Sequence, residues 1–378
     1  MARIAIVLNT SWNIYNFRLP LLDHLNRLGH EIIVMAPEDA YSRRIPYPFH
    51  HIPIQSKSLN PVRDMVLFFT LYRLLKKTSP DILLLYTIKP NVYGNFAAYL
   101  LKIKTISNIA GLGALFINPG WVTKLAKVLY RLAMKVPAKV FFQNNEDMEM
   151  FIKEGLVSKT IAERIPGSGV DLARFNCSSD TVTKEGKFVF LLFSRMLWDK
   201  GVGEYVEAAG SLLRKRSDVE FQLLGFLDSD NPQAISGKEM ERLTAMDGII
   251  YLGASDHVED FIQKADCVVL PSYKEGVPRS LLEAAAMAKP IIATDVTGCR
   301  DVVEDGVNGF LCPPRDSGAL FDKMEKMAGL DIRERTRLGN NGREKVKKNF
   351  DQNIVIEKYV RAVENILVCG TKNANNLQ

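Results

Sequence analysis

Two carboxylates in the last third of the chain lie in a turn and in the helix expected to follow it. The preceding run Cys267–Leu270 is short and apolar, which is typical of an interior parallel strand. Gly276 permits the backbone angles of a sharp turn, and Pro278 suits the first position of a helix. A helix that starts here leaves backbone amides free at Arg279 and Ser280, which predicts an anion site.

Glu275 belongs to this turn, and Glu283 follows about 1.5 turns inside the helix, so both carboxylates can reach one cleft. A carboxylate repels phosphate but accepts hydrogen bonds from hydroxyl groups. The segment therefore predicts a ligand that carries both phosphate and sugar. The alternative is that Glu283 is a solvated helix residue and Glu275 an ordinary loop charge.

A second group of candidate residues follows the run Phe188–Phe193. Arg195 and Lys200 stand five residues apart on a loop that enters a helix. A forked guanidinium and a compact ammonium at this spacing can clamp a diphosphate and neutralise charge on a departing oxygen. No D-x-D sequence is present to hold a metal, so we expect side chains and helix amides to replace Mg²⁺ and expect no cofactor. The alternative is that both cations are solvated surface charges.

The segment from Glu275 to Glu283 resembles the E-x7-E motif of retaining glycosyltransferases of family 4, which have the two-domain GT-B fold. In that family the first Glu contacts the donor sugar and the second holds the ribose. The resemblance implies a catalytic group of Glu275, Arg195 and Lys200. It also implies a donor-binding set made of Glu283, Gly276, Val277, Arg279, Ser280, Gly225 and Ser255. The last two lie in loops that line the nucleotide in similar enzymes.

The first half of the chain departs from the common family pattern in two loops. The loop 9–18 replaces a Gly-Gly loop, and the stretch 86–91 stands where many members have a His. These loops supply the expected acceptor-side residues Asn13, Tyr15, Arg18, Lys89 and Asn91.

The same loops, with the segments 111–113 and 166–171, resemble the branch that builds bacterial capsules, O-antigens and lipid-linked oligosaccharides. The resemblance implies a UDP-sugar donor and an acceptor saccharide on a polyprenyl diphosphate. The transferred sugar would be a hexose or an N-acetylhexosamine.

Composition predicts a two-domain cytoplasmic protein. A chain of 378 residues is too long for one ordinary core. Its five cysteines show no C-x-x-C spacing, which favours a reducing compartment. The longest apolar run, 65–75, is too short to span a membrane.

Charge is distributed unevenly. Residues 1–170 carry 21 basic and 11 acidic side chains, and the range 41–139 carries fifteen basic ones against only Asp64 and Asp81. The expected helix 122–136 places Lys124, Lys127, Arg131 and Lys135 along an apolar segment. Such a helix can lie on an anionic membrane, which would put the protein at the inner face of the cytoplasmic membrane. The alternative is a domain helix with solvated lysines. Motifs for nucleic-acid binding are absent.

Alternation of strand-like and helix-like segments predicts an α/β fold with parallel sheets. The expected strands are 3–9, 31–36, 82–87, 105–109, 139–143, 188–193, 220–224, 267–270 and 290–294. The expected helices are 17–28, 61–77, 92–102, 122–136, 203–214, 258–264, 280–288 and 333–368. We expect two doubly wound Rossmann-like domains facing a central cleft. Residues 1–170 form the acceptor-side domain, 171–187 a linker, 188–354 the nucleotide-sugar domain, and 355–378 a helix that returns to the first domain.

Two other functions remain open at this stage. A nucleotide-sugar epimerase or hydrolase of the same fold would release free sugar without an acceptor. A non-enzymatic two-lobed sugar-binding protein would not need Arg195 and Lys200. Dehydrogenase chemistry is disfavoured because G-x-G-x-x-G is absent after the first expected strand.

Overall fold

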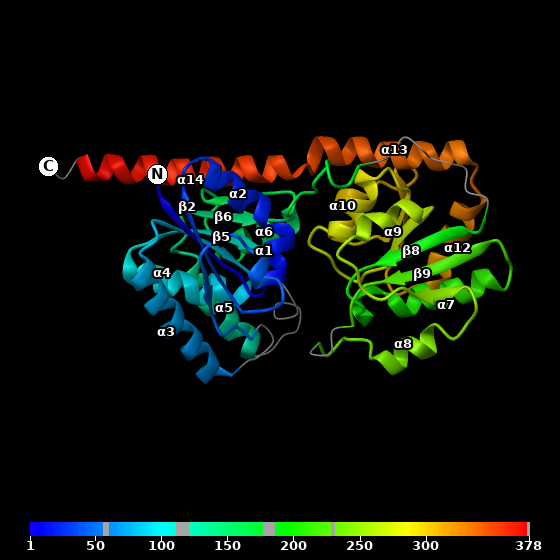
Figure 1. The fold of residues 1–378 in the computed structure, drawn as a ribbon, viewed down its shortest axis with the longest axis horizontal. Helices are drawn as coiled ribbons and strands as arrows, with labels where there is room; N and C mark the ends of the chain where they lie inside the picture. The colour runs from blue at the N-terminus through cyan, green and yellow to red at the C-terminus, as the bar shows by residue number, and fades with distance from the viewer. Residues whose placement is uncertain (56–59, 111–120, 177–185, 228–230, 376–378) are drawn as a thin grey trace. The chain divides into compact units, whose positions relative to one another are not determined.

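The computed structural model describes residues 1–55, 60–110, 121–176, 186–227 and 231–375, and it separates into two compact units (Figure 1). Unit 1 contains Met1–Ser168 together with the segment that begins at Asn353. Unit 2 contains Gly169–Gln352. Each unit is a parallel sheet covered by helices on both faces, so the predicted α/β class with two Rossmann-like domains is confirmed.

Within the described residues, unit 1 has a seven-stranded sheet in the order β3-β2-β1-β4-β5-β6-β7, and its strand pairs are parallel. The strands are β1 (Arg3–Val7), β2 (Glu31–Ala36), β3 (Phe49–His51), β4 (Ile82–Tyr86), β5 (Lys104–Ile109), β6 (Lys139–Phe142) and β7 (Ala162–Arg164). Strand order reverses between β1 and β4. In an open parallel sheet, ligands bind outside the carboxyl ends of the strands at such a switch point.

Helices cover both faces of this sheet (Figure 1). One face carries α1 (Ser11–Phe17), α2 (Leu19–Arg27) and α14 (Gln352–Asn375). The other carries α3 (Pro61–Thr78), the π-helical turn η2 (Pro90–Gly94), α4 (Asn95–Leu101), α5 (Trp121–Ala133) and α6 (Asn145–Lys153). Alternate side chains of β4 serve the two cores: Leu84 packs with the first group and Leu85 with the second.

Unit 2 has a six-stranded sheet within the described residues, in the order β10-β9-β8-β11-β12-β13, again with parallel pairs. The strands are β8 (Phe188–Phe193), β9 (Val219–Leu224), β10 (Ile249–Tyr251), β11 (Cys267–Leu270), β12 (Ile291–Thr294) and β13 (Gly309–Cys312). The switch point of this sheet lies between β8 and β11. Its helices are α7 (Val202–Leu213), α8 (Gly237–Leu243), α9 (Val258–Lys264), α10 (Arg279–Ala286), α11 (Thr297–Val302), α12 (Ser317–Gly329) and α13 (Ile332–Asn349).

The structure corrects three expectations about local structure. The segment expected as a loop after the first strand contains helix α1, whose first turn is capped by the Thr10 hydroxyl, which accepts from the Asn13 amide at 3.1 Å. Pro278 is the N-cap of α10 rather than its first helical residue. The tail expected as one helix is two helices, because α13 ends before Phe350 and α14 begins at Gln352.

One expected segment is not described, and another is described only in part. Residues 111–113 and most of the expected linker lie outside the described residues. The start of that linker packs in unit 2, where Phe175 is buried in the same core as β11 and α10. No helix in the described part of the chain is both long and apolar enough to cross a bilayer.

Candidate active site

The switch point of unit 2 brings together two segments that lie 75 residues apart in the sequence. The loop after β8 ends in the 3-10 turn η4 (Trp198–Lys200), and the loop after β11 carries Glu275. Lys200 Nζ donates to Glu275 Oε1 at 2.6 Å, and both side chains are mostly buried, at 16% and 13% exposed. The predicted catalytic pair is therefore a direct ion pair at the carboxyl ends of β8 and β11.

Backbone contacts hold these two loops against each other. The Tyr273 amide donates to the Asp199 carbonyl at 2.9 Å, and the Ser272 hydroxyl donates to the same carbonyl at 3.2 Å. Gly201 has φ +74°, and a Cβ there would lie 2.1 Å from the Pro271 carbonyl oxygen. Only glycine fits at this position. This role of Gly201 was not predicted, although a Gly directly after the predicted Lys is its signal in the sequence.

Gly225 shows a second close approach between loops. It has φ +154°, and a Cβ there would lie 1.6 Å from the Ser194 carbonyl oxygen. The Tyr251 hydroxyl donates to the Gly225 carbonyl at 2.7 Å. The loops after β8, β9 and β10 are thus fixed to one another. Ser255 belongs to the last of these loops, where its hydroxyl accepts from the His257 amide at 3.0 Å.

Arg195 lies on the same loop as Lys200, and its side chain is exposed. The Arg195 carbonyl accepts from the Leu197 amide at 2.8 Å, which forms a tight turn at the end of β8. The diphosphate clamp by Arg195 and Lys200 stays a prediction, supported by their shared place at the switch point.

Gly276 and Val277 form the turn between β11 and α10. A Cβ on Gly298, in the first turn of α11, would lie 2.2 Å from the Gly276 carbonyl oxygen. The missing side chain of Gly298 therefore lets α11 approach the turn closely. Val277 is half-buried and packs against the core beneath. Ser280, in the first turn of α10, is half-buried.

Arg279 and Glu283 form a second ion pair along α10. Arg279 Nε donates to Glu283 Oε1 at 2.7 Å, and Arg279 Nη1 donates to the Gly169 carbonyl at 3.2 Å. Burial raises the pKa of Glu283 above its ordinary value, and the charge and hydrogen bond of Arg279 act in the opposite direction. Glu283 is buried, which the sequence pattern did not predict.

In unit 1 the switch point between β1 and β4 contains a buried cation. Arg18 is 6% exposed, and its guanidinium carbon lies 4.3 Å from the centre of the Tyr86 ring. Its Nε atom is buried and has no hydrogen-bond partner among the described residues. No described carboxylate forms a salt bridge with this guanidinium. A buried charge without a counter-ion is costly, so the arrangement suits an anionic ligand.

The other expected acceptor-side residues have different surroundings. Asn13 lies on α1, and its Oδ1 atom is buried without a partner among the described residues. Tyr15 packs against Tyr41 at a ring distance of 5.6 Å. Lys89 Nζ forms an ion pair with Asp64 of α3 at 2.6 Å. Asn91 is fully buried and donates to the Asn108 carbonyl at 2.8 Å, so it links η2 to β5.

The expected membrane helix α5 is partly neutralised by α6. Lys127 forms an ion pair with Glu154 at 2.7 Å, and Arg131 Nη2 donates to the Glu154 carbonyl at 3.0 Å. Lys135 is exposed. The side chain of Lys124 lies outside the described residues. Glu154 was not predicted as a partner of this stripe, because it lies 27 residues after Lys127 in the sequence.

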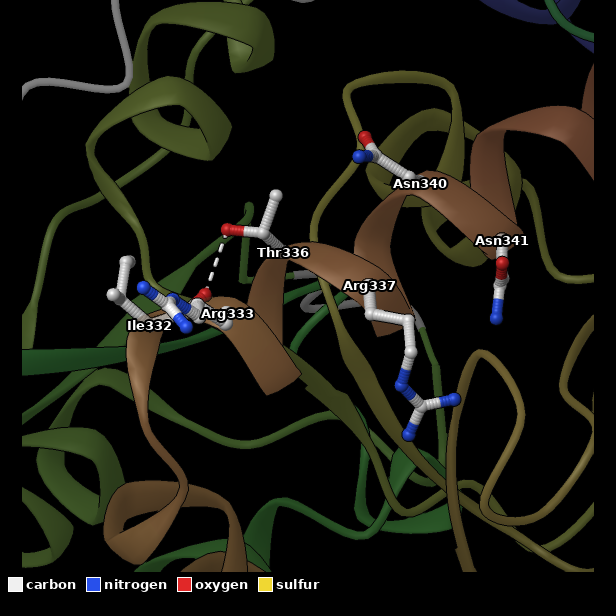
Figure 2. A pocket seen from close by; sticks show the side chains of 6 residues that line it. All are labelled: Ile332, Arg333, Thr336, Arg337, Asn340 and Asn341. Atoms are coloured by element: carbon white, nitrogen blue, oxygen red, sulfur yellow. Dashed lines mark hydrogen bonds between the residues drawn. The ribbon is translucent and has the colours of Figure 1, made fainter.

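A hollow of about 480 Å³ lies on the outer side of α13 (Figure 2). Its lining includes Arg333, Arg337 and Asn340, and the Thr336 hydroxyl there donates to the Ile332 carbonyl at 2.7 Å. It includes none of the expected site residues and no carboxylate to position a substrate.

Comparisons with known proteins agree with the fold and the class of chemistry. Residues 187–329 match the family model described as "Glycosyl transferases group 1", and residues 3–144 match "Glycosyl transferase 4-like".

Two characterised relatives are similar over most of their lengths. The N,N'-diacetylbacillosaminyl-diphospho-undecaprenol alpha-1,3-N-acetylgalactosaminyltransferase of Campylobacter jejuni is 29% identical, over 97% of this chain and 99% of that protein. The UDP-Gal:alpha-D-GlcNAc-diphosphoundecaprenol alpha-1,3-galactosyltransferase of Escherichia coli is 24% identical, over 79% of each.

Among solved structures, Anabaena HepE in complex with UDP and glucose superposes with a TM-score of 0.79 at 17% identity, over 97% of this chain and 100% of that one. The chain therefore belongs to the family 4 glycosyltransferases, with group 1 and family 4-like domains in a GT-B fold.

Proposed function

We propose that this glycosyltransferase moves a hexose or N-acetylhexosamine, with retention, from a UDP-sugar to a saccharide carried on a polyprenyl diphosphate. The observation that carries the proposal is the Lys200–Glu275 ion pair at the switch point of unit 2. An ammonium there suits a leaving diphosphate, and a carboxylate there suits the hydroxyl groups of a sugar. The names of the two relatives describe acceptors of this kind.

In the proposed reaction, the acceptor hydroxyl attacks the anomeric carbon on the side from which the diphosphate leaves. The bond between the anomeric carbon and the diphosphate oxygen breaks, and the leaving phosphate accepts the proton of the hydroxyl. Lys200 and Arg195 hold the negative charge that develops on that oxygen. Glu275 orients the donor sugar. Glu283 is the ribose ligand of this proposal, and the amides at the start of α10 add further positive potential.

Metal independence is part of the proposal, because two cations and a helix start supply the charge that Mg²⁺ supplies elsewhere. Turnover that persists after chelation and dialysis would support it. Loss of turnover that Mg²⁺ or Mn²⁺ restores would contradict it.

The test of the site uses the variants Lys200→Met and Glu275→Gln. UDP release and product mass are measured with a panel of UDP-sugars and a membrane extract that contains lipid-linked acceptors. We expect each variant to lose about 10²–10³ in turnover, the usual cost of removing one preorganised charged group at a developing charge. The double variant should be little worse than either single one, because paired residues act as a unit.

The exposed ion pair Lys215–Glu325, also in unit 2 and 3.2 Å long, offers a matched control. Lys215→Met and Glu325→Gln should leave turnover unchanged. Wild-type turnover in Lys200→Met and Glu275→Gln would overturn the site assignment. Absence of turnover with every UDP-sugar would redirect the donor assignment to another nucleotide.

A further inference from the structure

Exposed apolar side chains gather on three helices of unit 1. Among the described residues, sixteen large apolar side chains are exposed, and half of them belong to α3, α4 and α5. Those on α3 and α4 are Val62, Met65, Val66, Phe69, Tyr99 and Leu100, with exposed fractions between 49% and 69%. Single exposed apolar residues are ordinary, whereas a group of them marks an interaction surface.

Helix α3 is apolar on two opposite sides. Its inner side places Leu67, Leu71 and Leu75 in the core against the sheet. At 100° per residue, the exposed residues from Val62 to Phe69 lie on the opposite side. A helix that only covers a sheet has no need of this second apolar stripe.

The outer side of α3 changes character along its length. Its first half is apolar, and its second half continues the same stripe with basic residues. These basic residues are Arg73, Lys76 and Lys77, all exposed. We call the outer stripe 62–77 of α3, together with Tyr99 and Leu100 of α4, the α3 face. The two helices pack directly against each other on one side of the sheet (Figure 1).

The α3 face has no unpaired carboxylate among the described residues. The acid of α3, Asp64, accepts from Lys89 Nζ at 2.6 Å and from the Tyr93 hydroxyl at 2.9 Å. Charge therefore argues against a second copy of this chain as the occupant, since two such faces would bring basic residues together. An anionic bilayer suits both the apolar and the basic half of the α3 stripe, because its acyl boundary accepts apolar side chains and its headgroups attract cations.

We propose that the α3 face docks into the headgroup region of an anionic bilayer. The apolar first half of α3 enters the boundary between headgroups and acyl chains, and the basic second half lies among the headgroups. Tyr99 lies at the interface, where aromatic side chains with a polar tip are favoured.

Docking of this face has a consequence for the candidate acceptor site. Asp64, in the first turn of α3, is paired with Lys89 in the loop after β4. The apolar end of α3 is therefore fixed to the loop at the carboxyl end of β4, where the Arg18 guanidinium lies over Tyr86. Docking would bring that switch point to the depth of a lipid-linked diphosphate. This consequence rests on the proposed function, whereas the docking itself does not.

The test is vesicle flotation in the absence of donor and acceptor. We expect the wild-type protein to bind vesicles of phosphatidylglycerol and phosphatidylcholine, and to bind pure phosphatidylcholine more weakly. The double variant Met65→Asp/Phe69→Asp should reduce the partition coefficient at least about tenfold, because two apolar anchors are lost and two like charges are added. Both side chains are exposed, so the fold should persist, which circular dichroism would check.

A matched control is Ile332→Asp, which adds an acid at an equally exposed apolar residue at the start of α13 in unit 2. It should bind vesicles like wild type. Unchanged binding by Met65→Asp/Phe69→Asp would overturn the proposal and assign binding to another surface such as α5. Failure of the wild type to bind anionic vesicles would overturn it outright. Self-association that this double variant abolishes would instead identify the α3 face as an interface between copies.

Transfer to a short-chain, water-soluble polyprenyl-diphosphate saccharide separates the two proposals. The double variant should keep wild-type turnover in this assay, because no membrane is needed. Vesicle binding without any transfer would contradict the proposed function and leave docking intact. Transfer without vesicle binding would do the reverse.

Discussion

Removing the Arg279 side chain should leave a buried carboxylate of unit 2 without its ion-pair partner. Its partner Glu283 is 7% exposed, and the guanidinium of Arg279 lies 2.7 Å from the carboxylate. Breaking a buried ion pair by deleting one member costs about 3–5 kcal/mol. Arg279 is itself 18% exposed, and Arg174 adds a favourable charge near Glu283, so the lower end of that range applies. We expect Arg279→Met to lower the free energy of unfolding by about 3 kcal/mol at pH 7.

The stability lost in Arg279→Met should depend on pH, and the protonation of Glu283 sets the direction of that dependence. Burial raises the folded-state pKa of Glu283 above its ordinary value of 4.5. At pH values between the unfolded pKa and the folded pKa, the folded state therefore holds more protons than the unfolded state. Stability then falls as pH rises from the unfolded pKa through the folded pKa. Without Arg279 the folded pKa rises further, and the window extends upward. The deficit of Arg279→Met relative to wild type should be small near pH 5 and larger at pH 7.

Urea unfolding at both pH values measures the effect. Tryptophan fluorescence can report unit 2 alone if Trp12 and Trp121 are replaced by Phe, because Trp198 is the remaining tryptophan. Adding Glu283→Gln to Arg279→Met should restore most of the stability, since no buried charge then remains.

The exposed pair Arg300–Asp295, 3.0 Å long, provides the comparison. Arg300→Met should cost less than about 1 kcal/mol. An equal loss in Arg279→Met and Arg300→Met would refute the reasoning. A deficit that neither pH 5 nor Glu283→Gln relieves would also refute it.

Two further predictions concern the switch points. Gly201→Ala should lower the free energy of unfolding in urea by about 3 kcal/mol, because it adds left-handed backbone strain and a clash with the Pro271 carbonyl. The control Gly237→Ala, with open space at the start of α8, should be neutral or slightly stabilising. Arg18→Lys keeps the charge but loses the planar fork over Tyr86. It should raise the KM for the lipid-linked acceptor with the KM for the UDP-sugar unchanged, and equal changes in both would contradict an acceptor-side role.

Apolar periodicity predicted the interior elements well. The expected bounds of β11 and α9 match the structure residue for residue, because four consecutive apolar residues and a short amphipathic segment leave little choice. The edge strands β3, β7 and β10 have only three residues each, too few to show a pattern. Helix α1 was missed because its sequence, rich in Asn and aromatic residues, has low helix propensity. Packing of Ile14 in the core supplies the stabilisation that its low helix propensity does not give α1.

The candidate site could be predicted only as two separate pieces. The resemblance to family 4 identified both Lys200 and Glu275, but their contact depends on β8 and β11 being neighbours in the sheet. Strand order is a property of the whole unit, and no local sequence pattern in either loop predicts it. The same limit applies to Lys127 and Glu154, and to Lys89 and Asp64, since each pair joins elements that only the fold brings together.

The Lys200–Glu275 pair resolves a difficulty that its residue types create. A lone carboxylate beside a diphosphate site would repel the donor, and a lone buried ammonium would be costly before the donor binds. Paired at 2.6 Å, the two charges compensate each other before the donor binds. In the proposed reaction the incoming diphosphate competes for Lys200, which frees an oxygen of Glu275 to accept hydrogen bonds from the sugar. One turn can therefore carry a carboxylate for the sugar and still admit an anionic donor, because each charge is compensated both before and after binding.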